Sequence, residues 1–223
     1  NTSSQRTIRG NGAGSSALLI SNAASSNTVT QSYITNTAGG GAVFLGVTNN
    51  NTISQSTISS NGFYALDFQG ASSNTVTQSY ISNPAGYAAY LFAGSKNNTI
   101  SRSTMTSNAV GYSALYIADS ASNTVTQSFL SNPVSTAAYL GLSANYNTIS
   151  FSTASTNSGF PAVYLTLSSG NIFTQDYISN SGSGYGLFIY DGANSNLVSQ
   201  SHISGGMRFD GGQNNNTVTG STL

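Results

Sequence analysis

The sequence lacks cysteine entirely, and only 4% of its 223 residues are charged. Without cysteine, disulfide bonds and thiolate-bound metals are excluded. The net charge is zero, and the basic residues form no cluster that could bind nucleic acid: they are Arg6, Arg9, Lys96, Arg102 and Arg208. The longest apolar run, about seven residues from Ala88, is too short to span a bilayer. No secretion signal opens the chain, which predicts a mature product or a fragment.

The sequence does contain one motif, N-T-[VI]-[ST]-x-S, which recurs about every 24 residues. A repeat of this length is the signature of a solenoid. Because the repeat continues from end to end, we expect one domain over residues 1–223. Copies of the motif, some of them degenerate, begin at Asn27, Asn51, Asn74, Asn98, Asn123, Asn147, Asn171, Asn196 and Asn216, and a weaker copy begins at Asn1.

Alternation within one repeat predicts which side chains point inward. Val29 and Ile34 belong to a first strand with a bend at Ser32, and Val43 and Leu45 belong to a second strand. Equivalent positions are apolar in nearly every repeat. The sequence therefore predicts two strands per coil and four apolar stacks along the whole chain.

Polar residues recur at the bends. A serine column that includes Ser32 is expected to pass hydrogen bonds from hydroxyl to hydroxyl. Asp176 replaces this serine, where it either marks a cation site or a catalytic carboxylate, or bonds the hydroxyls of Ser152 and Ser201, which is the favoured interpretation. An asparagine column that includes Asn36 suits tight corners and amide-to-amide bonding. The gap between the isoleucine and asparagine columns alternates between two and three residues, which indicates a two-coil sequence unit.

On these motifs the chain resembles right-handed parallel β-helix repeat proteins, similar in architecture to pectate lyases and to repeat domains of bacterial surface proteins. The resemblance implies an all-β, right-handed parallel β-helix of about nine coils of about 24 residues. In enzymes of this group, the resemblance implies acidic residues clustered on one face of neighbouring coils.

Such a cluster is not evident in the sequence, where Asp67, Asp119, Asp176, Asp191 and Asp210 fall in different coils. Asp119 and Asp191 share a column but lie three coils apart, roughly 14 Å at about 4.8 Å per coil. That separation is too large for an acid–base pair. The only histidine, His202, is expected at the surface. The sequence thus predicts isolated surface aspartates, no catalytic residues, no metal or cofactor site, and a protein that is not an enzyme.

Two outward columns are candidates for contact surfaces. The aromatic one is interrupted by Asp67 and consists of Phe44, Tyr90, Tyr116, Tyr139, Tyr164 and Phe188. Its rings either support one another or form a contact surface for a sugar polymer or a neighbouring filament. The other column repeats Thr-x-Thr or Thr-x-Ser from Thr28 and resembles the ice-binding face of β-helical antifreeze proteins, although threonine is also simply a favoured strand residue.

The leading interpretation is a non-enzymatic structural protein at the cell surface or outside the cell, either a filament subunit or an adhesin stalk. No amphipathic capping helix is evident, so we expect head-to-tail self-association or flanking repeats of a longer chain. The alternatives are a carbohydrate-binding or carbohydrate-active module with polysaccharide as its partner, and an ice-binding protein. Neither nucleic acid nor a membrane is expected as a partner.

Overall fold

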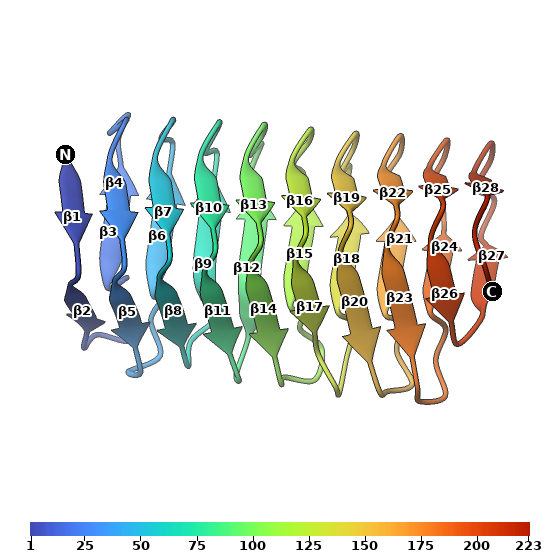
Figure 1. The fold of residues 1–223 in the computed structure, drawn as a ribbon, viewed down its shortest axis with the longest axis horizontal. Helices are drawn as coiled ribbons and strands as arrows, with labels where there is room; N and C mark the ends of the chain where they lie inside the picture. Colours follow the sequence, from blue (N-terminus) through green and yellow to red (C-terminus); the bar gives the residue numbers. More distant parts are fainter.

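A computed structural model describes all of residues 1–223, and it is a stack of coils built only from strands and turns. Figure 1 shows the coils side by side along one axis, with the two termini at opposite ends. Each complete coil contributes one strand to each of three parallel sheets. No helix in the structure is long and apolar enough to cross a membrane.

We call the three sheets A, B and C in the order in which the chain visits them. Sheet A has ten strands: β1 (Thr2–Ser4), β4 (Thr28–Thr30), β7 (Thr52–Ser54), β10 (Thr75–Thr77), β13 (Thr99–Ser101), β16 (Thr124–Thr126), β19 (Thr148–Ser150), β22 (Ile172–Thr174), β25 (Leu197–Ser199) and β28 (Thr217–Thr219). Sheet B has nine: β2 (Thr7–Gly10), β5 (Tyr33–Asn36), β8 (Thr57–Ser60), β11 (Tyr80–Asn83), β14 (Thr104–Ser107), β17 (Phe129–Ser131), β20 (Thr153–Thr156), β23 (Tyr177–Asn180) and β26 (His202–Ser204). Sheet C also has nine: β3 (Leu18–Ser21), β6 (Val43–Gly46), β9 (Tyr64–Gln69), β12 (Tyr87–Phe92), β15 (Leu115–Ala118), β18 (Ala138–Gly141), β21 (Val163–Thr166), β24 (Leu187–Tyr190) and β27 (Met207–Asp210).

The core confirms the predicted columns. Val76, Ile100 and Val125 pair in register in sheet A and are all buried. Ile81 and Leu91 hold the corresponding inward positions of sheets B and C. Together, 40 buried apolar residues form one continuous core along the coil axis. The predicted all-β parallel β-helix is therefore confirmed.

The predicted number of strands per coil is wrong: each coil has three strands, because the chain turns sharply between sheets A and B. At this bend Gln31 adopts a left-handed conformation with φ of 49°, and Gln55 does the same at 50° in the next coil. A single left-handed residue redirects the chain sharply, because its φ differs from that of the flanking strands by more than about 100°. What the sequence presents as one bent strand is thus a pair of strands in two sheets.

The serine at this bend is buried, but its hydrogen bonds differ from those predicted. Ser32 Oγ donates to the carbonyl oxygen of Thr30 at 2.8 Å, and the Ser32 N–H donates to Ser56 Oγ at 3.1 Å. Each hydroxyl therefore joins its own bend to the backbone of the preceding coil. This arrangement satisfies a buried donor and a buried acceptor in each coil.

The amide ladder lies in a different column from the predicted one. The asparagine that opens each repeat, such as Asn98, donates from its side-chain amide to the Oδ1 of the next, Asn123, at 3.0 Å. The backbone N–H of Asn98 donates to the same oxygen at 3.0 Å. These asparagines are buried through the middle of the stack. They tie successive coils together at the corner between sheets C and A.

The predicted column around Asn36 instead bonds backbone carbonyls of its own and the preceding coil, at the corner between sheets B and C. Asn83 donates to the carbonyl oxygens of Gly62 and Tyr87 at 2.9 and 3.0 Å. The next coil places Ser107 in register with Asn83, and its hydroxyl donates to Gly86 O at 2.8 Å. Asparagine alternates with serine or threonine in this way from Asn36 to Asn180, which explains the two-coil sequence unit.

Candidate functional site

Aromatic side chains gather on the outer face of sheet C. Tyr90, Tyr116, Tyr139, Tyr164 and Phe188 occupy one register position in five consecutive strands, β12 to β24. Further rings stand beside them at the ends of these strands and in the preceding turns. We call the combined set the aromatic surface: Phe44, Phe63, Tyr64, Tyr87, Tyr90, Tyr112, Tyr116, Tyr139, Tyr164, Tyr185, Phe188 and Tyr190.

Rings of neighbouring coils stack on one another within this surface. The ring centroids of Tyr90 and Tyr116 are 5.1 Å apart, and those of Tyr116 and Tyr139 are 4.9 Å apart with an interplanar angle of 4°. The stack breaks at Tyr164, whose ring is inclined at 72° to that of Tyr139. Stacked rings cover one another's faces, so solvent meets mainly ring edges and phenol hydroxyls. The prediction that the rings support one another agrees with this geometry.

Rings in the turns and at the strand ends widen the aromatic surface beyond the column that the sequence predicts. Phe63 lies edge-on to Tyr87 and Tyr112 at centroid distances of 5.3 and 5.8 Å, and Tyr87 contacts Tyr116 at 4.7 Å. These residues occur in only a few repeats, so no repeating column of the sequence predicts their place. Only the packing of adjacent coils brings them together with the predicted stripe.

Partial burial raises the pKa of several tyrosine hydroxyls above the ordinary value of 10.0. Desolvation, together with the neighbouring phenols, raises the pKa of Tyr139 to about 12. Desolvation is also the main cause that raises the pKa of Tyr90 to about 12, with Tyr116 and Asp67 contributing. Near neutral pH these groups are hydrogen-bond donors and acceptors without charge.

Asp67 lies beneath this surface, contrary to the prediction that it is an isolated surface residue. It occupies the same column in register with Phe44 and Tyr90, yet its exposed fraction is 0%. Neither carboxyl oxygen has a hydrogen-bond partner. Because desolvation disfavours the charged form, the pKa of Asp67 is raised to about 7. A sequence signal was present in retrospect, because a short side chain between two large rings is readily covered.

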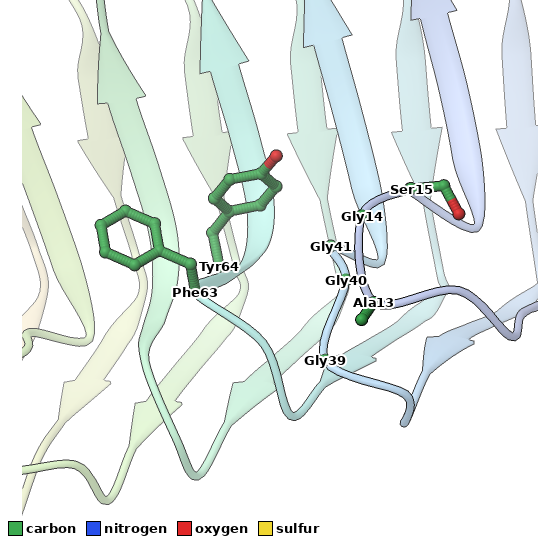
Figure 2. A pocket seen from close by; sticks show the side chains of 8 residues that line it. All are labelled: Ala13, Gly14, Ser15, Gly39, Gly40, Gly41, Phe63 and Tyr64. Carbon is green, nitrogen blue, oxygen red and sulfur yellow. The ribbon is translucent and has the colours of Figure 1, made fainter.

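A small pocket adjoins the aromatic surface at the corner between sheets B and C (Figure 2). Its volume is about 150 Å³, and it is lined by two glycine-rich turns, residues 13–15 and 39–41, and by Phe63 and Tyr64. Figure 2 shows the Tyr64 ring beside these turns and the Phe63 ring pointing away from them. A Cβ atom on Gly41 would lie 2.3 Å from Tyr64 Cε2, so the glycine is what admits this ring.

The remaining candidate residues are dispersed. Asp176 is buried in the serine column, where its Oδ1 accepts the Ser152 N–H at 2.8 Å. Its own N–H donates to Ser201 Oγ at 3.1 Å. Asp176 thus takes the structural place of a serine, but its carboxylate bonds neither of the predicted hydroxyls, and Oδ2 has no partner. His202 stacks on Tyr177 at 5.0 Å on the outside of sheet B. No group of three His, Cys, Asp or Glu side chains that could hold a metal ion is present.

The threonine column forms the outer face of sheet A. Where a serine follows a threonine in the next coil, the two hydroxyls bond, as in Ser54 Oγ to Thr30 Oγ1 at 3.0 Å and Ser101 Oγ to Thr77 Oγ1 at 2.9 Å. Many hydroxyls of this face are thus engaged with one another. Ile172 and Leu197 interrupt the face near its C-terminal end.

The family model for right-handed β-helix regions matches residues 2–112 and 98–223, which together cover almost the whole chain. The chain belongs to the right-handed β-helix family. A comparison with curated protein sequences finds no match. The family match therefore confirms the fold predicted from the sequence, in agreement with the structure.

Several solved structures share the architecture of this β-helix. The A-module of mannuronan C-5 epimerase AlgE6 from Azotobacter vinelandii aligns with a TM-score of 0.65 and 11% identity, over 88% of this chain and 64% of that one. This β-helix thus spans less than two thirds of the epimerase module. An endo-xylogalacturonan hydrolase from Aspergillus tubingensis aligns with a TM-score of 0.64 and 12% identity, over 97% of this chain and 84% of that one. An alginate lyase from Paenibacillus sp. aligns with a TM-score of 0.53 and 10% identity, over 96% and 99%.

These similarities contradict the prediction of a non-enzymatic filament subunit or adhesin stalk. That prediction took a regular, low-charge solenoid as a sign of a structural role, whereas the three solved structures described above share this fold and are enzymes that act on carbohydrates. The prediction that the protein is not an enzyme is wrong for the same reason. At 10–12% identity the likeness establishes the fold alone.

Proposed function

We propose that this β-helix is a carbohydrate-active module that holds a polysaccharide along its aromatic surface. The observation that carries the proposal is the unbroken row of half-buried rings from Tyr90 to Phe188, one ring per coil. An extended aromatic strip suits the apolar faces and edges of sugar rings, and phenol hydroxyls suit their hydroxyl groups. The similarity of the fold to carbohydrate-active enzymes supports the same function.

The proposed direction of the polysaccharide follows from the ring spacing. Successive ring centroids from Tyr90 to Phe188 are 4.9–5.5 Å apart. An extended polymer parallel to the coil axis would therefore meet a new ring in every coil. Binding would add up over several coils, as it does in other solenoids with repeated contact surfaces.

Asp67 is the candidate acid of this surface. A carboxyl group with a pKa near neutrality can hold a proton there and donate it to a leaving oxygen. The side chain is fully buried, with Phe44 and Tyr90 in register on the two adjacent coils, so a bound sugar would have to displace a neighbouring side chain to reach it. The group that must move is a ring at the edge of the aromatic surface. Of the rings of this surface, Tyr64 is the nearest to Asp67 in the sequence.

Binding is tested by surface plasmon resonance on immobilised polysaccharides chosen from a glycan array. Tyr116→Ala and Tyr139→Ala should each weaken binding roughly tenfold, because a well-placed ring contributes about 1 kcal/mol or more. The matched control is Tyr80→Ala, which removes a 47% exposed tyrosine from the outer face of sheet B. Absence of binding by the wild-type protein, or equal losses in all three variants, would refute the proposed surface.

Catalysis is tested on each polysaccharide that binds, by assays for new reducing ends and for unsaturated products. Asp67→Asn keeps the shape of the side chain and removes its acidity. We expect turnover to fall by a factor of about 10² or more while binding is retained. Turnover unaffected by Asp67→Asn would exclude this residue as the acid.

A further inference from the structure

We infer that the polysaccharide held by the aromatic surface is uncharged. This inference rests on the proposed function and specifies its ligand. The inferred ligand differs from those of several structural neighbours, whose names give mannuronan, alginate and xylogalacturonan. The distribution of charged side chains over the three sheets supports an uncharged ligand.

The outer face of sheet C has one cation, and that cation is already paired. Arg208 forms an ion pair with Asp210 in the same strand. Its guanidinium group also lies 5.1 Å from the centroid of the Phe188 ring and 5.8 Å from that of Tyr185. A carboxylate ligand would have to share this guanidinium group with Asp210, which already neutralises its charge.

None of the other four basic residues belongs to a strand of sheet C, and Lys96 alone lies next to that sheet. Arg9 belongs to β2 of sheet B, and Lys96 lies at the corner between sheets C and A, in register with Ser72 and Ala121. Arg6 and Arg102 lie at the bends between sheets A and B, where Arg102 Nε donates to Gln127 Oε1 at 3.2 Å. None of them belongs to a strand of the aromatic surface.

The remaining charges near the aromatic surface are acidic. Asp119 and Asp191 directly follow strands β15 and β24 and are exposed. Asp67 lies buried beneath the rings. A polyuronate has a carboxylate on every sugar and is bound through Arg and Lys side chains that pair with those carboxylates. Here a polyanion would meet unpaired carboxylates instead, whereas a neutral sugar meets rings and uncharged phenol hydroxyls.

The experiment measures binding of the full chain to neutral and acidic polymers in parallel. Hydroxyethyl cellulose, galactomannan and mixed-linkage β-glucan serve as neutral polymers, and alginate and polygalacturonate serve as polyuronates. Surface plasmon resonance is recorded at low salt and at about 0.15 M salt, where charges are screened beyond roughly 8 Å. We expect at least one neutral polymer to bind roughly tenfold or more tightly than either polyuronate, with an affinity that salt leaves unchanged.

The outcomes separate this inference from the proposed function. Polyuronate binding that equals or exceeds neutral binding, and that salt weakens, overturns the inference while the proposed surface stands. Binding of neither class overturns both. Loss of neutral binding in Tyr116→Ala, with retention in Tyr80→Ala, locates the neutral ligand on the aromatic surface.

A second variant tests the charge argument directly. Asp210→Asn removes the partner of Arg208 and leaves its guanidinium free beside Phe188. We expect this variant to gain measurable alginate binding at low salt, which is lost at about 0.15 M salt, with no change in neutral binding. Unchanged alginate binding at low salt would contradict the view that missing cations exclude polyuronates.

Discussion

At the scale of single residues, Asp67 shows how the stacking of coils can bury a carboxyl group at an outward strand position. The side chain occupies an outward position of β9, which alone would leave it in water. Large rings in the adjacent coils cover it, and no donor compensates the lost hydration. Burial of a carboxyl group without a partner favours its neutral form.

This burial predicts a pH dependence of stability. The pKa of Asp67 is about 7 in the folded chain against 3.8 for the ordinary group, so the folded state binds more protons between these values. The free energy of unfolding therefore falls as pH rises from about 4 to about 7, by roughly 4 kcal/mol for a shift of about three pKa units. Asp176, with its pKa also raised to about 7, adds to the slope.

Denaturant unfolding between about pH 4 and pH 8 measures this slope. We expect Asp67→Asn to be flatter than the wild-type profile and more stable above pH 7. Asp119→Asn, which changes an exposed aspartate, is the matched control and should leave the slope unchanged. An Asp67→Asn profile parallel to that of the wild type would show that Asp67 is ionised throughout the folded state.

The asparagine ladder is a second residue-scale feature with a measurable effect. Asn123 Oδ1 accepts two N–H groups of Asn98, and its amide donates to Ser95 O at 3.0 Å. Asn123→Ala should destabilise the chain by about 2–4 kcal/mol, because it leaves buried polar groups unpaired. The same change at exposed Asn108 should cost less than about 0.5 kcal/mol. Thermal and urea unfolding would both have to show this contrast.

At the scale of elements, the turns between sheets B and C determine how closely the coils approach. A Cβ atom on Gly86 would lie 2.3 Å from the Phe63 carbonyl oxygen of the preceding coil. Gly14, in an equivalent turn near the N-terminal end, has nothing within 4 Å of such an atom. Gly86→Ala should therefore destabilise the fold by about 1–3 kcal/mol, and Gly14→Ala should be nearly neutral. Comparable unfolding midpoints for the two variants would show that the backbone relaxes at little cost.

Sequence patterns predict the elements wherever a position repeats in every coil. Val76, Ile100 and Val125 were assigned to the core because period-two alternation and a repeat of about 24 residues agree there. The turn at Gln31 was predicted only as a bend within one strand, although glutamine recurs at this left-handed position, as at Gln55 and Gln78. The candidate site was predicted only as a row of rings, because the burial of Asp67 depends on side chains in other coils.

At the scale of the whole molecule, each coil contacts only its neighbours, and the core is one column of side chains from end to end. Stability in such a solenoid is approximately a sum over coils and their interfaces. Charge contributes little, since the chain forms one ion pair, at the exposed Arg208. The same substitution should therefore differ in effect according to its place along the axis.

Two valines of the same column in sheet A test this dependence. Val125 in β16 is packed between Ile100 and Ile149, whereas Val218 in β28 packs against Val198 on one side only. Val125→Ala should lower the free energy of unfolding by about 2 kcal/mol and speed amide exchange throughout the central coils. Val218→Ala should affect exchange mainly in β25 and β28 and lower global stability by less than about 1 kcal/mol. Equal global losses would mean that the stack unfolds as a single unit with no weak end.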